Sequence, residues 1–125
     1  MANSSRHLPN MRIGDDYVLR LTYPFGTDIT GFKFYLTLKA SFDDADADAA
    51  LQTSWVAGEN TIDEPLIGIC FLSVPAIITA SIKRGSYFYD LQVITTSGAI
   101  ETIAPPMDDY KHKIIAVPSV TLATS

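Results

Sequence analysis

The chain has 125 residues, of which 47% are hydrophobic and 18% charged, so it is long enough for one domain with one core and too apolar for a disordered protein. Its net charge of −5 argues against nucleic-acid binding, which needs a basic surface to displace counterions from phosphates. The single cysteine, Cys70, excludes an internal disulfide and a thiolate metal cluster; inside an apolar run it is expected to be buried and inert.

The N-terminal stretch, residues 1–13, contains Asn, Ser, Pro and Arg without clear periodicity. We expect an arm that is mobile in the free protein and ordered against a neighbour in an assembly. The stretch lacks the apolar segment of a signal peptide, and no apolar run in the chain approaches the length of a bilayer span. These features predict a protein made in a cytoplasm that stays soluble until it assembles.

Two stretches with a period of two predict the first strands. In residues 15–23, Tyr17, Leu19, Leu21 and Tyr23 share one face, which indicates a half-buried strand. Turn residues occupy positions 24–28. Residues 32–40 form the second strand, whose apolar face is Phe32, Phe34, Leu36 and Leu38.

An acidic stretch, Asp43 to Asp48, follows in a loop over residues 41–52 that is predicted to end in at most one helical turn. Asp44, Asp46 and Asp48 have the spacing of an EF-hand loop, but Ala49 stands where its glycine is required and Trp55 where its glutamate is required. A solvated acidic loop is therefore expected, with a looser calcium site as the alternative. A short strand is predicted over residues 53–57.

The next segments are more apolar. Residues 66–74 are almost continuously apolar, which predicts a strand covered on both faces, with Gly68 at a bulge or a close backbone approach. Residues 75–85 begin with proline and end with glycine, which predicts a short helix or helical turns. Ile77, Ile78 and Ile82 are expected to face the core.

The last part of the chain predicts a β-hairpin and a final strand. In the first hairpin strand, Tyr87, Tyr89, Leu91 and Val93 share one face; residues 96–98 turn the chain and residues 99–104 return. Residues 110–117 form the final strand, and residues 118–125 a tail. The whole predicts an all-β fold, an immunoglobulin-like antiparallel β-sandwich over residues 14–117 with at most one short helix.

The chain offers little catalytic chemistry. Two scattered histidines, His7 and His112, do not predict a metal site. There is no G-x-S-x-G motif and no glycine-rich phosphate loop. Asp90 and Glu101, on the two arms of the hairpin, are better explained as strand-face acids than as a carboxylate pair. We therefore expect no enzyme, no cofactor and no metal.

A sugar-binding module is the harder alternative to dismiss, because β-sandwiches can present rows of aromatic side chains. The chain has six tyrosines. However, Tyr17, Tyr87 and Tyr89 are in phase with core-facing aliphatic residues, and aromatic residues in that register belong mostly to cores or interfaces.

Three segments in this order carry a resemblance to a known group. They are Gly14-Asp15-Asp16-Tyr17, then Asp28-Ile29-Thr30-Gly31-Phe32 with the alternation that follows it, and the run from Gly85 to Val93 with Gly98 and Glu101-Thr102-Ile103. The set, over about residues 14–117, resembles the small β-sandwich domains of tailed-bacteriophage virion proteins, above all the N-terminal domain of baseplate upper proteins and related small tail proteins.

The resemblance implies folding roles for the motif residues. Gly31 and Gly98 would allow tight turns, Asp28 would cap its turn through backbone amides, and Tyr87 and Tyr89 would bury their rings while their hydroxyls reach the rim. The other fold-defining positions of the motifs are Gly14 and Gly85.

The resemblance also implies a function. We expect a structural component of a tailed-phage virion, in the tail, collar, baseplate or fibre attachment, which acts through contacts with other virion proteins in a symmetric homo-oligomer. It would have no nucleic-acid or membrane partner. A capsid decoration protein and a carbohydrate-binding module that aids adsorption are the alternatives. The candidate assembly contacts lie in the two termini, either of which could add a strand to a neighbour's open sheet edge: Arg6, Arg12, Val120 and Leu122.

Overall fold

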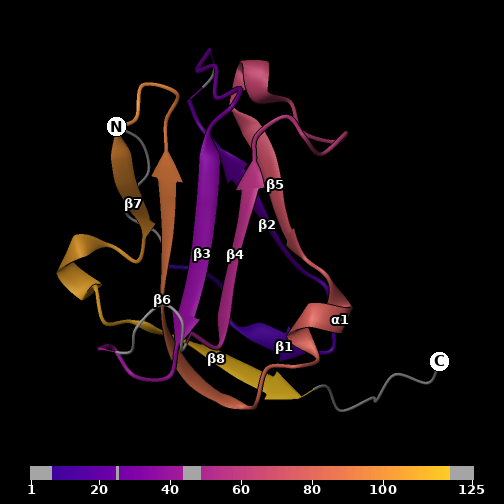
Figure 1. The fold of residues 1–125 in the computed structure, drawn as a ribbon, viewed down its shortest axis with the longest axis vertical. Coiled ribbons are helices and arrows are strands. Elements are labelled where there is room, and N and C mark those ends of the chain that lie inside the picture. The colour runs from indigo at the N-terminus through magenta and orange to yellow at the C-terminus, as the bar shows by residue number, and fades with distance from the viewer. Residues whose placement is uncertain (1–6, 25, 44–48, 119–125) are drawn as a thin grey trace.

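The computed structural model describes residues 7–24, 26–43 and 49–118 and shows two layers of β-strands (Figure 1). Within these residues there are eight strands: β1 (Met11–Ile13), β2 (Tyr17–Thr22), β3 (Lys33–Lys39), β4 (Leu51–Val56), β5 (Ile69–Val74), β6 (Gly85–Ile94), β7 (Ile100–Ala104) and β8 (Lys113–Pro118). One short helix, α1 (Ala76–Thr79), and two 3₁₀ turns, η2 (Pro65–Ile67) and η3 (Met107–Asp109), connect them. The prediction of an all-β, sandwich-like fold with one short helix is confirmed.

The larger layer has the strand order β1-β8-β6-β3-β4, and β7 also pairs with β6. The long strand β6 is shared, because its first part pairs with β8 and its last part with β7, on the edge away from β3. The smaller layer is the antiparallel pair β2-β5, which lies behind the larger one in Figure 1. One pairing departs from the predicted antiparallel arrangement, since β1 runs parallel to β8.

The period-two patterns correctly predicted which side chains enter the core. Successive side chains of a strand point to opposite faces, so one face of each strand is buried between the layers. Of the predicted inward residues, those within β2, β3 and β6 are buried, whereas Tyr23 and Phe32 lie just outside β2 and β3 and are only partly buried. Residues of β5 and β8 complete the core, whose members in these five strands are Tyr17, Leu19, Leu21, Phe34, Leu36, Leu38, Tyr87, Tyr89, Leu91, Val93, Cys70, Leu72, Val74, Ile114 and Ala116.

The N-terminal arm is shorter than the sequence predicts. Residues 7–13 belong to the domain, because Met11–Ile13 form β1 and the side chains of Leu8 and Met11 are buried. A hydrogen bond also ties this segment to β2, because the Tyr17 hydroxyl donates to the Pro9 carbonyl at 2.6 Å. Sequence periodicity missed β1 because a strand of three residues is too short to show alternation. At the other end, Pro118 belongs to β8 and not to the tail.

The predicted helix over residues 75–85 is a single turn, and the expected orientation of two isoleucines was wrong. Ile77 is 81% exposed and Ile78 41% exposed, whereas Ile82 is buried as predicted. A polar anchor orients the turn: the buried Thr79 hydroxyl donates to the Asp15 carbonyl at 2.7 Å and accepts from the Gly14 N–H at 3.0 Å. None of the helices in the described ranges has the length and hydropathy that a bilayer crossing requires.

The apolar run over residues 66–74 divides into two elements. Its first residues belong to η2, and the strand β5 begins only at Ile69. The burial of β5 alternates, so the strand is covered fully on one face and partly on the other, contrary to the prediction of two covered faces. Gly68 ends η2 and lies against the backbone of Tyr23, which confirms the close approach but not the bulge.

The residues of the three motifs take the folding roles that the resemblance implies. Asp28 Oδ1 accepts from the N–H of Thr30 at 3.0 Å and from its hydroxyl at 2.6 Å, and these bonds lower the pKa of the Asp28 carboxyl. The Tyr87 hydroxyl donates to the Lys83 carbonyl, and the Tyr89 hydroxyl accepts from the Leu8 N–H at 3.0 Å. The motif glycines all have positive φ: Gly14, Gly31, Gly85 and Gly98.

The buried Cys70 side chain confirms the expectation of a protected thiol, and burial raises its pKa to about 12. The reactive species is the thiolate, so the folded protein should react with a disulfide reagent such as DTNB at pH 8 far more slowly than the unfolded chain. A kinetic absorbance measurement with and without guanidinium checks this. Equal rates in the two conditions would contradict the burial of the thiol.

Candidate functional site

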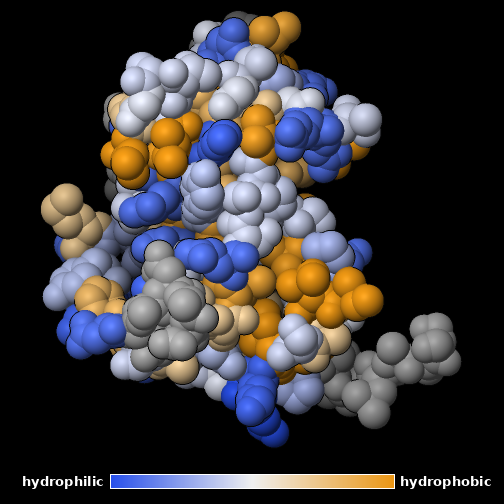
Figure 2. Space-filling view, viewed as in Figure 1, coloured by the Kyte–Doolittle hydropathy of each residue, from blue (hydrophilic) through white to orange (hydrophobic). Residues whose placement is uncertain are grey.

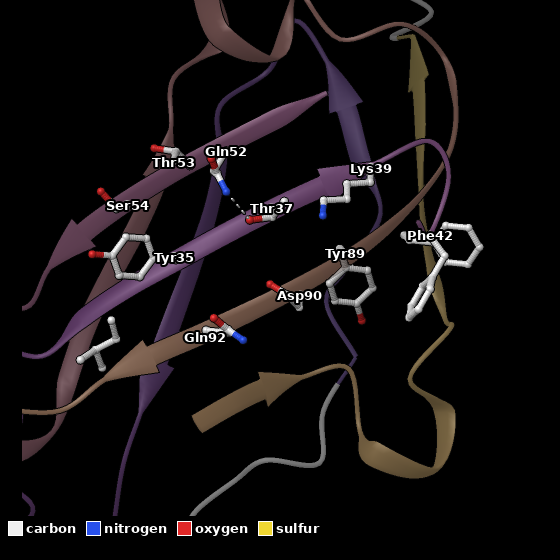
Figure 3. Close-up of a pocket in the computed structure, with 12 residues that line it drawn as sticks. Tyr35, Thr37, Lys39, Phe42, Gln52, Thr53, Ser54, Tyr89, Asp90 and Gln92 are labelled. Carbon is white, nitrogen blue, oxygen red and sulfur yellow. Dashed lines mark hydrogen bonds between the residues drawn. The ribbon is translucent and has the colours of Figure 1, made fainter. Parts of the chain in front are cut away.

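The outward face of the large sheet forms a groove of about 710 Å³ (Figure 3). Successive side chains of a strand point to opposite faces, so every second side chain of β3, β4 and β6 points outward and lines this groove. The lining residues come from these three strands and the loop after β3: Tyr35, Thr37, Lys39, Phe42, Gln52, Thr53, Ser54, Phe88, Tyr89, Asp90, Gln92 and Ile94.

Polar side chains occupy the middle of this groove. Gln52 Nε2 of β4 donates to the Thr37 hydroxyl of β3 at 3.3 Å, and Gln92 Nε2 of β6 donates to the Thr102 hydroxyl of β7 at 3.4 Å. Both bonds are long, and each glutamine keeps a second amide hydrogen and its oxygen for a ligand. Asp90 lies opposite Thr37 in the β3–β6 pairing. Hydroxyl, amide and carboxylate groups on a concave surface suit a ligand rich in hydroxyl groups.

One end of the groove is aromatic and carries positive charge beside it. The exposed Phe42 ring makes edge contacts with Phe88 at 5.5 Å and with Tyr110 at 5.8 Å between centroids. Lys111 Nζ lies 5.1 Å from the centre of the Phe42 ring, and Lys113 Nζ lies 4.4 Å from that of Phe88. Such cation–π contacts hold the rings and the ammonium groups together at the surface.

A second candidate surface is the free edge of β2. Among the described residues, β5 is the only strand that pairs with β2. In the register, Arg20 lies opposite Phe71 and Val18 opposite Ser73. The Phe71 N–H and the Ser73 carbonyl bond to side chains on the side away from β2. The pairs Arg20–Phe71 and Val18–Ser73 are therefore non-hydrogen-bonded pairs of the antiparallel ladder. In such pairs the backbone groups of Arg20 and Val18 point away from β5 as well.

The edge of β5 is closed by side chains, in contrast to that of β2. Asp63 Oδ1 accepts from the Phe71 N–H at 2.8 Å, and Trp55 Nε1 donates to the Ser73 carbonyl at 3.0 Å. These two groups use the positions that an added strand would bond to. The small layer therefore has one blocked edge and one open edge.

Apolar side chains are exposed near this layer. Val18, on the outward face of β2, is 52% exposed, and Ile77 and Ile78 of α1 are exposed as described above. Figure 2 shows an apolar area at the lower right, where Figure 1 draws α1, while the exposed face of the large sheet is mostly hydrophilic. Apolar exposure of this kind beside an open strand edge is a common feature of protein-binding surfaces.

The candidate assembly contacts are only partly within the described residues. Arg12 is exposed on β1, opposite Val117 of β8, and its role in assembly stays a prediction. Arg6, Val120 and Leu122 lie outside the described residues, as does the acidic stretch beyond Asp43.

The hairpin does not bring its two acids together. Glu101 lies opposite Val93, a core-facing residue, whereas Asp90 shares a face with Gln92. The two carboxylates are therefore on opposite faces of the hairpin, and they form no acid pair of the kind that glycoside hydrolysis uses.

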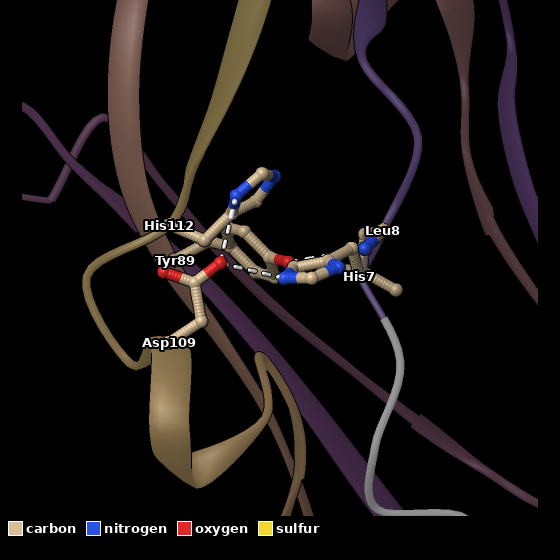
Figure 4. Close-up of polar contacts among 5 residues, drawn as sticks. All are labelled: His7, Leu8, Tyr89, Asp109 and His112. Carbon is tan, nitrogen blue, oxygen red and sulfur yellow. Dashed lines mark hydrogen bonds and ion pairs between the residues drawn. The ribbon is translucent and has the colours of Figure 1, made fainter.

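The structure brings together two histidines that are far apart in the sequence. His7 and His112 are in ring contact, with centroids 4.0 Å apart, and Asp109 lies between them (Figure 4). The premise that the two histidines are remote was wrong. The i,i+3 spacing of Asp109 and His112 was visible in the sequence, but nothing there indicated that residue 7 returns to residue 112.

Comparison of this chain with protein-family models, with curated proteins and with solved structures finds no match.

Proposed function

We propose that this protein is a structural module of a tailed-phage virion that acts through protein–protein contacts in a symmetric assembly of its own copies. The observation that supports this most is the open edge of β2, next to a β5 edge that is closed. The motif resemblance supplies the setting.

The proposed contact is strand addition. An extended segment that lies beside β2 would bond to the outward backbone groups of Val18 and Arg20, and apolar side chains of that segment would cover Val18. In a ring or tube of identical copies, each copy would donate one segment and receive another, which makes a head-to-tail interface. The exposed side chains of α1 extend the same surface.

The test is Arg20→Pro, measured by analytical ultracentrifugation of the purified chain. Proline at this position removes an N–H that points away from β5, so no bond within the small sheet is lost. We expect concentration-dependent oligomers of the unchanged protein and a monomer for the variant, with the same circular dichroism spectrum. Arg20→Ala is the matched control and should still assemble.

A second variant, Val18→Lys with Thr22→Lys, blocks the same edge with charge and leaves the backbone unchanged. An unchanged chain that stays monomeric over the whole concentration range would contradict assembly of like copies. Antibody-labelled images of particles from a host that expresses the gene test the virion setting, and they distinguish a tail position from decoration of the head.

Carbohydrate binding is the second candidate function, because the groove on the large sheet has polar side chains at its centre and aromatic side chains at one end. Tyr35→Ala and Gln92→Ala should each reduce binding on a glycan array more than about tenfold, since each removes a group that faces the ligand. Val18→Ala, away from the groove, should have no effect. If the unchanged protein binds no glycan on the array, this second function is wrong.

A further inference from the structure

Three side chains with metal-binding atoms converge at the junction of the arm and the domain (Figure 4). Asp109 Oδ2 lies 2.9 Å from His7 Nε2 and 3.4 Å from His112 Nδ1. All three ligand atoms lie within 4.8 Å of one another. They come from segments that are far apart in the sequence, so the fold itself creates this cluster.

The supporting structure holds the cluster in place from both sides. The His112 N–H donates to the Asp109 carbonyl at 3.0 Å in the turn after η3, which keeps these two side chains on the same side of the chain. The Tyr89 ring lies edge-on to His112, with centroids 6.3 Å apart, and its hydroxyl accepts from the Leu8 N–H. Tyr89 therefore fixes the position of both imidazole-bearing segments.

The separations of the Asp109 oxygen from the two imidazole nitrogens are close to those of a transition-metal site. With bonds of about 2.0–2.1 Å, the ligand atoms of a tetrahedral Zn²⁺ site lie about 3.3–3.4 Å apart. The separations of 2.9 Å and 3.4 Å from Asp109 Oδ2 differ from that value by at most a few tenths of an ångström, and the exposed His7 side chain can adjust.

We propose that His7, Asp109 and His112 bind a divalent transition-metal ion, with Zn²⁺ as the expected occupant. Two imidazole nitrogens and one carboxylate oxygen are ligands typical of Zn²⁺, and they disfavour Ca²⁺ and Mg²⁺, which prefer oxygen ligands only. Water fills the remaining position. The ion acts as a clamp, because it joins the N-terminal arm to the segment before β8 and so fixes the arm on the domain.

The experiment is a calorimetric titration of the full, untagged chain with ZnCl₂, since a polyhistidine tag would itself bind the ion. We expect one saturable site per chain. His7→Ala and His112→Ala should each weaken binding more than about tenfold. Asp108→Asn is the matched control: this carboxylate also belongs to η3 but lies outside the cluster, and its loss should leave the affinity unchanged.

Two further measurements follow the clamp itself. The chain has only two histidines, so NMR should show both sets of imidazole signals shifting with Zn²⁺. Hydrogen exchange of the Leu8 amide should slow when the ion is bound, and it should not respond to the ion in His112→Ala. Absence of a saturable site, or Zn²⁺ binding that survives the removal of both histidines, would overturn the proposal. Thermal melts in EDTA establish that each variant is folded.

Discussion

Met11→Ala should lower the free energy of unfolding by about 2–5 kcal/mol, although the residue lies in a segment that the sequence marks as an arm. Met11 is completely buried and lies opposite Ala116 in the parallel pairing of β1 with β8. Truncation of the Met11 side chain leaves a cavity and removes apolar contacts between β1 and β8. Because a domain of this size has only about 5–15 kcal/mol of stability, the loss should be plain in the midpoint of a urea denaturation curve.

Arg12→Ala is the control for this prediction, because Arg12 is the next residue of β1 and its side chain is exposed. We expect a change within about 0.5 kcal/mol. If Met11→Ala unfolds at the same urea concentration as Arg12→Ala, the burial of the Met11 side chain against the domain is contradicted.

The same packing changes how the termini have to be tested. Removal of residues 1–12 takes away Leu8, Met11 and most of β1, so such a chain would be destabilised before its assembly could be judged. A chain without residues 1–5 keeps Arg6 and all described residues. A chain without residues 1–6 differs from it only by the loss of Arg6. The difference between these two truncations in ultracentrifugation reports on Arg6.

The sequence predicted the strands whose side chains alternate over six residues or more. β2, β3 and β6 are of this kind, and their inward residues were identified correctly because one face of each strand is buried. The short helix was also predicted, from the proline and glycine around it. The orientation of the helix was not predicted, because the hydrogen bonds of Thr79 outweigh two apolar side chains in a helix of one turn.

The features that the sequence could not show depend on contacts between remote segments. The meeting of His7 with His112 requires the arm to return to the domain, and β1 is too short to signal this. The groove depends on which strands are neighbours in the large sheet. The closed edge of β5 depends on Trp55 and Asp63, whose side chains reach backbone groups across loops that the local pattern does not fix.

The arm connects the two proposals about this protein. Residues 7–13 are packed on their own domain through β1 and the buried Leu8 and Met11, so they are not free to add a strand to a neighbour, and a bound ion would hold them there more firmly. The segments left for strand addition at β2 are then the residues before His7 and those after Pro118.

Gly68→Ala should be strongly destabilising, by about 2–5 kcal/mol, for two reasons that add. Gly68 has a φ of +84°, where residues with a Cβ are strained. A Cβ at this position would also lie 2.9 Å from the Tyr23 Cβ and 3.1 Å from the Thr27 carbonyl oxygen. The backbone cannot easily retreat, because the Gly68 carbonyl accepts from the Tyr23 N–H at 2.8 Å, where β2 ends and β5 begins.

Gly98→Ala separates the two contributions. Gly98 has a similar φ of +92°, but a Cβ there would meet no atom within 4 Å. This variant should therefore lose only the conformational part, about 1–2 kcal/mol, and the difference between the two variants in urea denaturation measures the cost of the clash. Equal losses would mean that the loop around Tyr23 gives way without cost. Such a result would contradict the close approach of Gly68 to the end of β2.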